Sequence, residues 1–149
     1  MRWQTLDYLG GTYEVADGSA RFDVGGMNLP LLIGQMTSMK WIAEQVGLDW
    51  AINRISALGS YAYQRLSELK GVQVVTPAER MAGLVTFVVE GIDAQDLSNR
   101  LRTEHNVTIR FVDTYINNPR ANRLCTGFYN TVEDIDRLIG AVTAVRDRS

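Results

Sequence analysis

Residues 123–138 read RLCTGFYNTVEDIDRL, a strand-like run followed directly by the start of a helix. The run begins with Arg123 and is largely apolar. Thr131 is a suitable N-cap, and the acidic residues after it suit the positive end of a helix dipole. Apolar positions then recur every three or four residues as far as Val145, as in a helix with one buried face. This stretch therefore predicts a strand over 123–128 and a C-terminal helix joined by a short loop.

The sequence upstream of this stretch predicts further helices and strands in a definite order. The expected helices cover 31–47, a segment capped by Asp49 and closed by Gly71, a segment capped by Asp93, and the C-terminal segment. The expected strands cover 72–76, 84–89, 107–112 and 123–128. Strands that follow one another in pairs favour an antiparallel or mixed sheet with helices on one face. The fold class is therefore α+β, a two-layer domain with a small sheet covered by helices.

The first 30 residues differ from the rest because they are rich in turn signals. Short strands over 13–15 and 20–24 are expected to flank the turn at 16–19, which contains Asp-Gly. We therefore divide the chain into a turn-rich segment, 1–30, and an α+β domain, 31–149.

The bulk composition excludes several classes of function. The 149 residues are 46% hydrophobic and 21% charged, as in ordinary folded domains. A net charge of -2 gives no basic surface for nucleic acid. No apolar run is long enough for a membrane span, and no signal peptide is expected. One cysteine and one histidine cannot form a disulfide or a metal cluster, so a cytoplasmic protein is expected.

Reactive side chains are also scarce. Of the 15 basic residues only Lys40 and Lys70 are lysines, and no Ser/His/Asp or Cys/His set surrounds His105. A self-contained hydrolase or metalloenzyme is therefore poorly supported. The strongest functional signal is Arg123, because an arginine on a rigid strand can hold a carboxylate through two parallel hydrogen bonds.

Three separated segments follow the patterns of one known enzyme family. RFDVGGMN over 21–28 is similar to Arg-aromatic-acidic-x-Gly-Thr-x-Asn, and VTIR over 107–110 resembles Ile-x-Val-Arg. RLCTGFYNT over 123–131, with the helix after it, is similar to Arg-x-Ser-x-x-x-Tyr-Asn-Thr. In this order the segments resemble the C-terminal small domain of the class V aminotransferase superfamily. These are fold-type I pyridoxal-phosphate (PLP) enzymes and include cysteine desulfurases and isopenicillin-epimerase-like proteins.

The resemblance implies roles for four residues. Arg123 would hold the α-carboxylate of an amino-acid substrate. Arg110 stands at the family's second strand arginine and is the second candidate for binding the substrate. Gly25 and Gly26 would reach into the neighbouring subunit of a dimer and approach the cofactor phosphate. Gly26 replaces the family's threonine, so a hydroxyl contact is lost.

The resemblance also implies what this chain lacks. In the family, PLP forms a Schiff base with a lysine of the large domain, in a context that neither Lys40 nor Lys70 shares. We therefore expect the last third of an enzyme: inactive alone, without covalently bound cofactor, and partnered by a PLP-binding large domain or companion subunit. Desulfurases carry a nucleophilic cysteine on the loop that matches 113–122, which has none here. An aminotransferase, epimerase or lyase therefore fits better.

Simpler interpretations remain for the same residues. Arg123 can form an ordinary ion pair with Asp113 or Glu133, and Arg110 can be solvated. The two glycines can form a plain turn, and Cys125 can be a small core residue. The alternative function is a non-catalytic α+β module for ligand binding or dimerisation, and a homo-oligomer is expected in either case.

Overall fold

A computed structural model of the chain describes residues 3–7, 9–22, 26, 28–113 and 120–148. The chain divides into two compact units, Met1–Val46 and Gly47–Ser149. Within the described ranges, no helix is both long and apolar enough to cross a bilayer. Nor do those ranges bring three metal-ligating side chains together.

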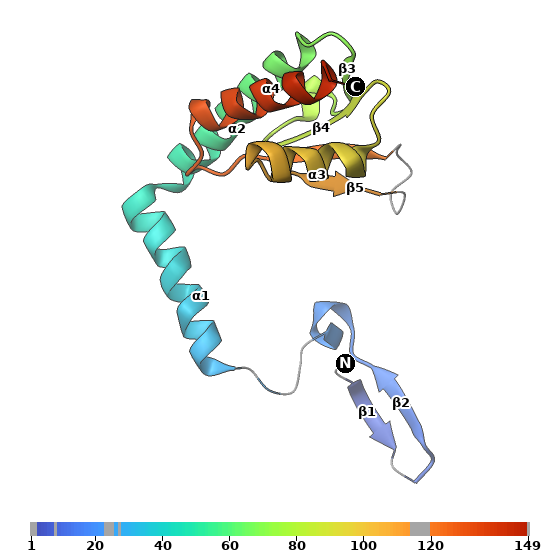
Figure 1. The fold of residues 1–149 in the computed structure, drawn as a ribbon. Helices are drawn as coiled ribbons and strands as arrows, with labels where there is room; N and C mark the ends of the chain where they lie inside the picture. Colours follow the sequence, from blue (N-terminus) through green and yellow to red (C-terminus); the bar gives the residue numbers. More distant parts are fainter. Residues whose placement is uncertain (1–2, 8, 23–25, 27, 114–119, 149) are drawn as a thin grey trace. The chain divides into compact units, whose positions relative to one another are not determined.

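The larger unit contains a four-stranded antiparallel sheet (Figure 1). Its strands are β3 (Val72–Val74), β4 (Leu84–Val89), β5 (Arg110–Val112) and β6 (Ala121–Cys125), in the order β3-β4-β6-β5. Helices α2 (Leu48–Ser67), α3 (Ala94–His105) and α4 (Val132–Arg146) pack on it, with α4 contacting both other helices. This arrangement confirms the predicted two-layer α+β fold.

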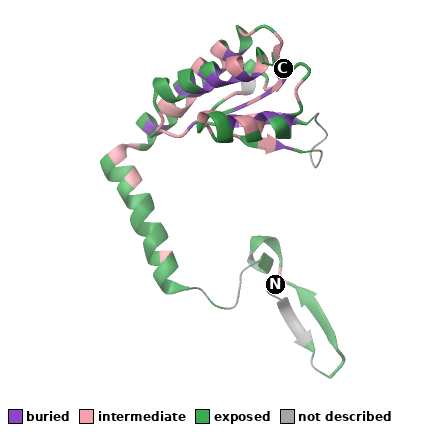
Figure 2. Ribbon diagram, viewed as in Figure 1, coloured by how far each residue is buried: buried purple, intermediate pink, exposed green. Residues whose placement is uncertain are grey.

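The core lies between these helices and one face of the sheet (Figure 2). Side chains alternate along β4, so Val85, Phe87 and Val89 are buried while Leu84, at 50% exposure, is not. Helix residues that share the core with the strands are Leu58, Ala62, Leu66, Leu97, Leu101, Ile135, Leu138, Ile139, Ala141, Val142 and Val145. All three helices thus cover the same face, and the other face of the sheet carries the alternate side chains.

The helix starts follow local capping chemistry. Asp93 caps α3 by accepting hydrogen bonds from the backbone N–H groups of Gln95 and Asp96. Thr131 and Asp134 form a reciprocal capping box at α4. The expectation for α2 is wrong, because Asp49 lies in its first turn. Gly47, with φ of 86°, occupies the N-cap position.

Three strands have different limits from those expected. β3 ends at Val74 rather than at 76. β5 begins at Arg110 rather than at 107, since Asn106 adopts the left-handed conformation, with φ of 54°, and Val107 bonds back to Leu101. β6 covers Ala121–Cys125 rather than 123–128. It ends early because the chain turns at 127–130, where the backbone N–H of Gly127 donates to the Asn130 side chain.

The smaller unit begins with a hairpin that the sequence did not predict correctly. β1 (Trp3–Asp7) pairs antiparallel with β2 (Thr12–Val15), and Gly11 in the turn has φ of 66°. Strand 13–15 therefore exists but pairs with residues before it. Gly18–Phe22 forms a 3₁₀ helix instead of the expected strand over 20–24, whose positions 23–24 lie outside the described residues.

Helix α1 (Leu29–Trp41) follows and continues as a π-helical turn, Ile42–Val46. The Asn28 side chain accepts a hydrogen bond from the backbone N–H of Leu31 and caps the helix. Lys40 is its single charged residue, and none of its side chains is buried. The exposed large apolar residues are Leu29, Leu31, Ile33, Met36, Met39 and Trp41.

Candidate functional site

Arg123 lies in the middle of β6, with β4 on one side and β5 on the other. Its directly opposite partners are Thr86 on β4 and Arg110 on β5. Opposite residues of antiparallel strands project from the same face of a sheet. Since the next residue, Leu124, belongs to the core, Arg123 projects from the face that the helices leave uncovered. Thr86, Arg123 and Arg110 therefore form a row across three strands, called here the arginine row.

The Arg123 side chain is partly buried, and its Nε atom is fully enclosed. Within the described residues this Nε has no hydrogen-bond partner. A buried donor on a charged group that lacks a partner is costly, by about 1–3 kcal/mol or more. The simpler interpretation is not observed: among the described residues Arg123 pairs with neither Asp113 nor Glu133, and Asp113 lies 3.9 Å from Arg120. Among the described residues the guanidinium is therefore not committed to an ion pair.

Arg110, the other sequence-predicted substrate residue, is brought beside Arg123. Its side chain is exposed, and the described part of the chain gives it no ion pair or hydrogen bond. The structure therefore places two guanidinium groups on neighbouring strands of the same face.

The next row along the same face is formed by Leu84 and Cys125, which are also opposite each other. Cys125 is exposed, so its expected place as a core residue is wrong. The reason is strand alternation: Leu124 points to the helices, and Cys125 shares the other face with Arg123.

The predicted glycine pair is only partly described. Gly25 lies outside the described residues, and Gly26 is exposed with no atom within 4 Å of the position a Cβ would occupy. Gly26 belongs to the smaller unit and Arg123 to the larger one. The glycine role at a cofactor phosphate therefore stays a prediction.

Neither lysine has the surroundings that a Schiff base with PLP requires. Lys40 projects from α1 and lies 3.9 Å from Glu44, with 71% of its side chain exposed. Lys70 is also exposed, and its carbonyl accepts a hydrogen bond from Arg146. A Schiff-base lysine needs a desolvated site that lowers its pKa. The described residues therefore do not fit covalent attachment of the cofactor.

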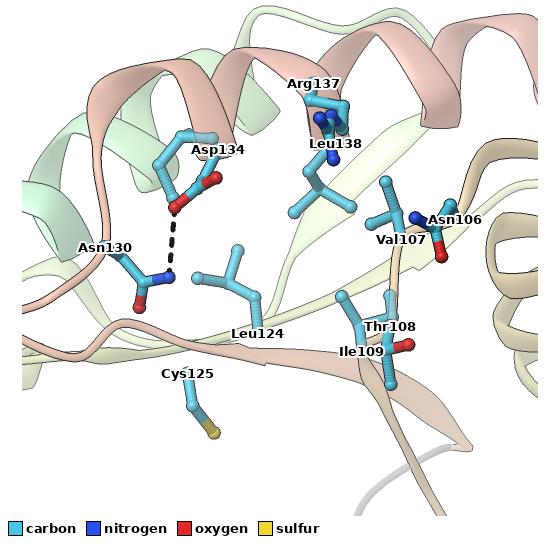
Figure 3. A pocket seen from close by; sticks show the side chains of 11 residues that line it. Asn106, Val107, Thr108, Ile109, Leu124, Cys125, Asn130, Asp134, Arg137 and Leu138 are labelled. Atoms are coloured by element: carbon cyan, nitrogen blue, oxygen red, sulfur yellow. Dashed lines mark hydrogen bonds between the residues drawn. The ribbon is translucent and has the colours of Figure 1, made fainter.

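A cavity of about 210 Å³ lies between segment 106–109, the end of β6 and the start of α4, and none of the three residues of the arginine row lines it (Figure 3). Its Asn130 and Asp134 side chains are 3.2 Å apart and bond to each other. Bonds from the Thr131 backbone N–H and from Asn130 lower the pKa of Asp134. These polar groups already serve the helix start. The cavity is also smaller than the roughly 300 Å³ of typical ligand sites, so it is a weak candidate for the substrate site.

Thr86 is the one member of the row that the sequence did not single out. It lies in a β-branched run with no local signal of function. Only the register between β4 and β6 places it opposite Arg123.

Known proteins resemble this chain in sequence and in fold. The profile of the family described as "Aminotransferase class-V" matches residues 5–138, which is most of the chain. The chain belongs to this family. This confirms the resemblance drawn from residues 21–28, 107–110 and 123–131.

Curated relatives of this class V chain include proteins named "Probable cysteine desulfurase". The relative from Staphylococcus aureus is 27% identical over 140 residues, which are 89% of this chain and 33% of the relative. The relative from Xylella fastidiosa is 28% identical over 133 residues, which are 85% of this chain and 32% of the relative. The class V chain thus spans about a third of the length of these proteins.

Solved structures show the same fold at lower identity. An apo cysteine desulfurase from Thermococcus onnurineus NA1 superposes with a TM-score of 0.74 and 22% identity, over 99% of this chain and 38% of that one. The cystine C-S lyase C-DES, in complex with cysteine persulfide, superposes with a TM-score of 0.70 and 22% identity. The match covers 95% of this chain and 36% of that one. A variant of that lyase holds glycine covalently linked to its PLP cofactor.

Proposed function

We propose that this class V chain is the domain that binds the substrate carboxylate in a PLP-dependent enzyme acting on an amino acid. Its place in the family supports PLP chemistry. The observation that carries the substrate role is the position of Arg123 on an inner strand, without an ion-pair partner among the described residues. The guanidinium offers two parallel N–H groups in a plane, which match the two oxygens of a carboxylate. Arg123 would then orient the amino acid rather than react with it.

The position of Arg123 in the sheet supports this role because strand pairing fixes the backbone from which the side chain projects. β6 is an inner strand, paired on both sides, so the backbone at Arg123 is fixed by its neighbours β4 and β5. Leu124 anchors the same strand in the core. A carboxylate bound here would be held at a defined position relative to the sheet.

The catalytic lysine belongs, in this proposal, to a PLP-binding large domain or companion subunit. Neither Lys40 nor Lys70 is suited to the reaction, so the chain alone would be inactive. PLP, when bound, supplies an electron sink for chemistry at the α-carbon. The backbone N–H groups of Gly25 and Gly26 would approach the cofactor phosphate, across a dimer interface as in the family. A cytoplasmic homo-oligomer is part of the same proposal.

The reaction class we favour is transamination, epimerisation or elimination. Segment 113–122 contains no cysteine, and Cys125 stands on β6 rather than on the loop before Arg123. A persulfide-forming nucleophile is therefore not available at the position where desulfurases carry theirs.

The test is binding of L-alanine to the purified chain, followed by isothermal calorimetry. Replacing Arg123 with Ala should abolish the binding heat, and Arg123→Lys should weaken binding because a single ammonium lacks the planar fork. Arg102→Ala is the matched control, because Arg102 is an exposed arginine on α3, away from the row. Unchanged binding in Arg123→Ala would contradict the carboxylate role.

A second measurement tests whether the catalytic lysine lies outside this chain. The chain incubated with PLP should show no stable visible absorption band. A band that disappears in Lys40→Ala or Lys70→Ala would show that the chain carries its own catalytic lysine. Carboxylate binding that depends on Arg123 and is not changed by adding a PLP-binding large domain would favour the non-catalytic module.

A further inference from the structure

The arginine row places two like charges directly opposite each other on neighbouring strands. The Cβ atoms of such a pair are about 5 Å apart, and like charges in this position destabilise a sheet. Arg110 and Arg123 therefore repel each other unless a negatively charged group binds to both guanidinium groups.

Arginines elsewhere in the larger unit are mostly supplied with acidic partners. The pairs are Arg65 with Asp136 at 2.9 Å, Arg100 with Glu104 at 3.4 Å, Arg120 with Asp93 at 3.1 Å, Arg146 with Asp147 at 2.7 Å and Arg148 with Glu104 at 3.3 Å. Arg102 and Arg137 are exposed on helices, where water solvates them. Within the described ranges, neither Arg110 nor Arg123 has an acidic partner. Arg110 and Arg123 differ from Arg102 and Arg137 because they lie directly opposite each other on neighbouring strands.

The surroundings of the row would strengthen an interaction with a negative group. On one side lie Val112 and Ala121, which are opposite each other and only 2% and 1% exposed. On the other side lie Leu84 and Cys125. None of these four residues is acidic. Apolar neighbours also lower the local dielectric, which strengthens charge-assisted hydrogen bonds.

We propose that the arginine row binds an amino acid with two carboxylates, such as glutamate or aspartate. This inference rests on the proposed function, in which Arg123 holds the α-carboxylate. Arg110 would hold the side-chain carboxylate. The two side chains leave the sheet from Cβ atoms about 5 Å apart, so both guanidinium groups can reach the two ends of one short dicarboxylate. Two bound carboxylates would neutralise both guanidinium groups, whereas one would leave a positive charge uncompensated.

The test compares L-glutamate with L-glutamine, which has the same shape but a neutral side chain. Each is titrated into the full chain, and the Arg Nε–Hε signals are followed by NMR. We expect glutamate to bind at least ten-fold more tightly than glutamine. Arg110→Gln should remove this preference, so that the affinities for the two ligands become nearly equal. Arg123→Gln should weaken both ligands, and Arg102→Gln should change neither.

The outcomes separate this inference from the proposed function. Equal affinity for the two ligands, with both weakened by Arg123→Gln, would overturn the two-carboxylate inference and leave the proposed function intact. A glutamate preference that survives in Arg110→Gln would also overturn the inference. If Arg123→Gln changed neither affinity, the proposed function would fall as well. An unchanged backbone spectrum shows that each variant is folded, and Arg110→Lys, which keeps the charge, should retain part of the preference.

Discussion

Gly59 shows how closely α2 approaches the segment before β4. The helix passes so near the carbonyl oxygen of Ala82 that a Cβ at Gly59 would overlap it. The obstruction is backbone, which cannot rotate away. We predict that Gly59→Ala lowers the free energy of unfolding by about 1–3 kcal/mol, the usual cost of overpacking. Urea denaturation followed by circular dichroism measures this.

Gly140 on α4 is the matched control. It is also helical, but it is exposed and no atom lies within 4 Å of its would-be Cβ. Gly140→Ala should therefore stabilise the protein by about 0.5–1 kcal/mol, because alanine suits a helix better. Equal effects of the two substitutions would show that Gly59 is not packed as described.

Single residues also show what the sequence could predict about the site. Arg123 and Arg110 were found because each stands in a recognisable pattern. The sequence did not predict that these two residues lie opposite each other. The register between β5 and β6 depends on the segment between the strands and not on local sequence. Cys125 was misplaced because composition alone favours burial of a cysteine. Counting alternate positions from Leu124 would have put it on the open face.

At the scale of elements, the start of α4 depends on the capping box of Thr131 and Asp134. The Thr131 hydroxyl accepts from the Asp134 backbone N–H, and the Asp134 carboxylate accepts from the Thr131 backbone N–H. Thr131→Ala should lower the free energy of unfolding by about 1 kcal/mol. Thr103→Ala, which removes only an exposed hydroxyl bonded within α3, should change it by less than about 0.5 kcal/mol. Thermal or urea unfolding compares the two variants.

The same box predicts a dependence on pH. Hydrogen bonds from Thr131 and Asn130 lower the pKa of Asp134 below its ordinary value of 3.8. A lowered pKa in the folded state means that this stabilisation is present above the unfolded pKa and is lost as pH falls through the folded one. Stability should therefore decline below about pH 4. Asp134→Asn should decline less steeply, because an amide accepts similar bonds without titrating. Urea unfolding at several pH values measures the free energy of unfolding of both proteins. An equal decline with falling pH in the unaltered protein and in Asp134→Asn would contradict this prediction.

Helices and strands were predicted well where the hydrophobic pattern extended over many residues and the capping residues were clear. α3 and α4 begin where Asp93 and Thr131 predicted, and β4 covers the expected 84–89. The N-terminal hairpin was mispredicted because Asp17-Gly18 is a stronger turn signal than Gly10-Gly11, yet β2 pairs with the residues before it. Pairing partners are a property of the tertiary structure, and short strands carry little information about them.

At the scale of the whole molecule, the core is concentrated in one unit. Every residue of the main hydrophobic cluster lies within Gly47–Ser149. We predict that a chain of residues 47–149 folds alone, with a free energy of unfolding within about 0.5 kcal/mol of the same transition in the full chain. Urea unfolding of both proteins measures this, and a non-cooperative transition in the shorter chain would contradict it.

Helix α1 leads to the last prediction, which concerns association. Large exposed apolar patches mark sites of association. Around α1 the apolar residues are interrupted by only one charge, Lys40, and all are exposed or partly exposed. In a purified sample the only available partner is a second copy of the chain, so the full chain should associate with itself. The 47–149 chain and the variant Ile33→Glu, Met36→Glu should sediment as monomers at the same concentration. Leu84→Glu is the control for an exposed apolar residue outside α1 and should still associate. A monomeric full chain would show that α1 alone does not drive association.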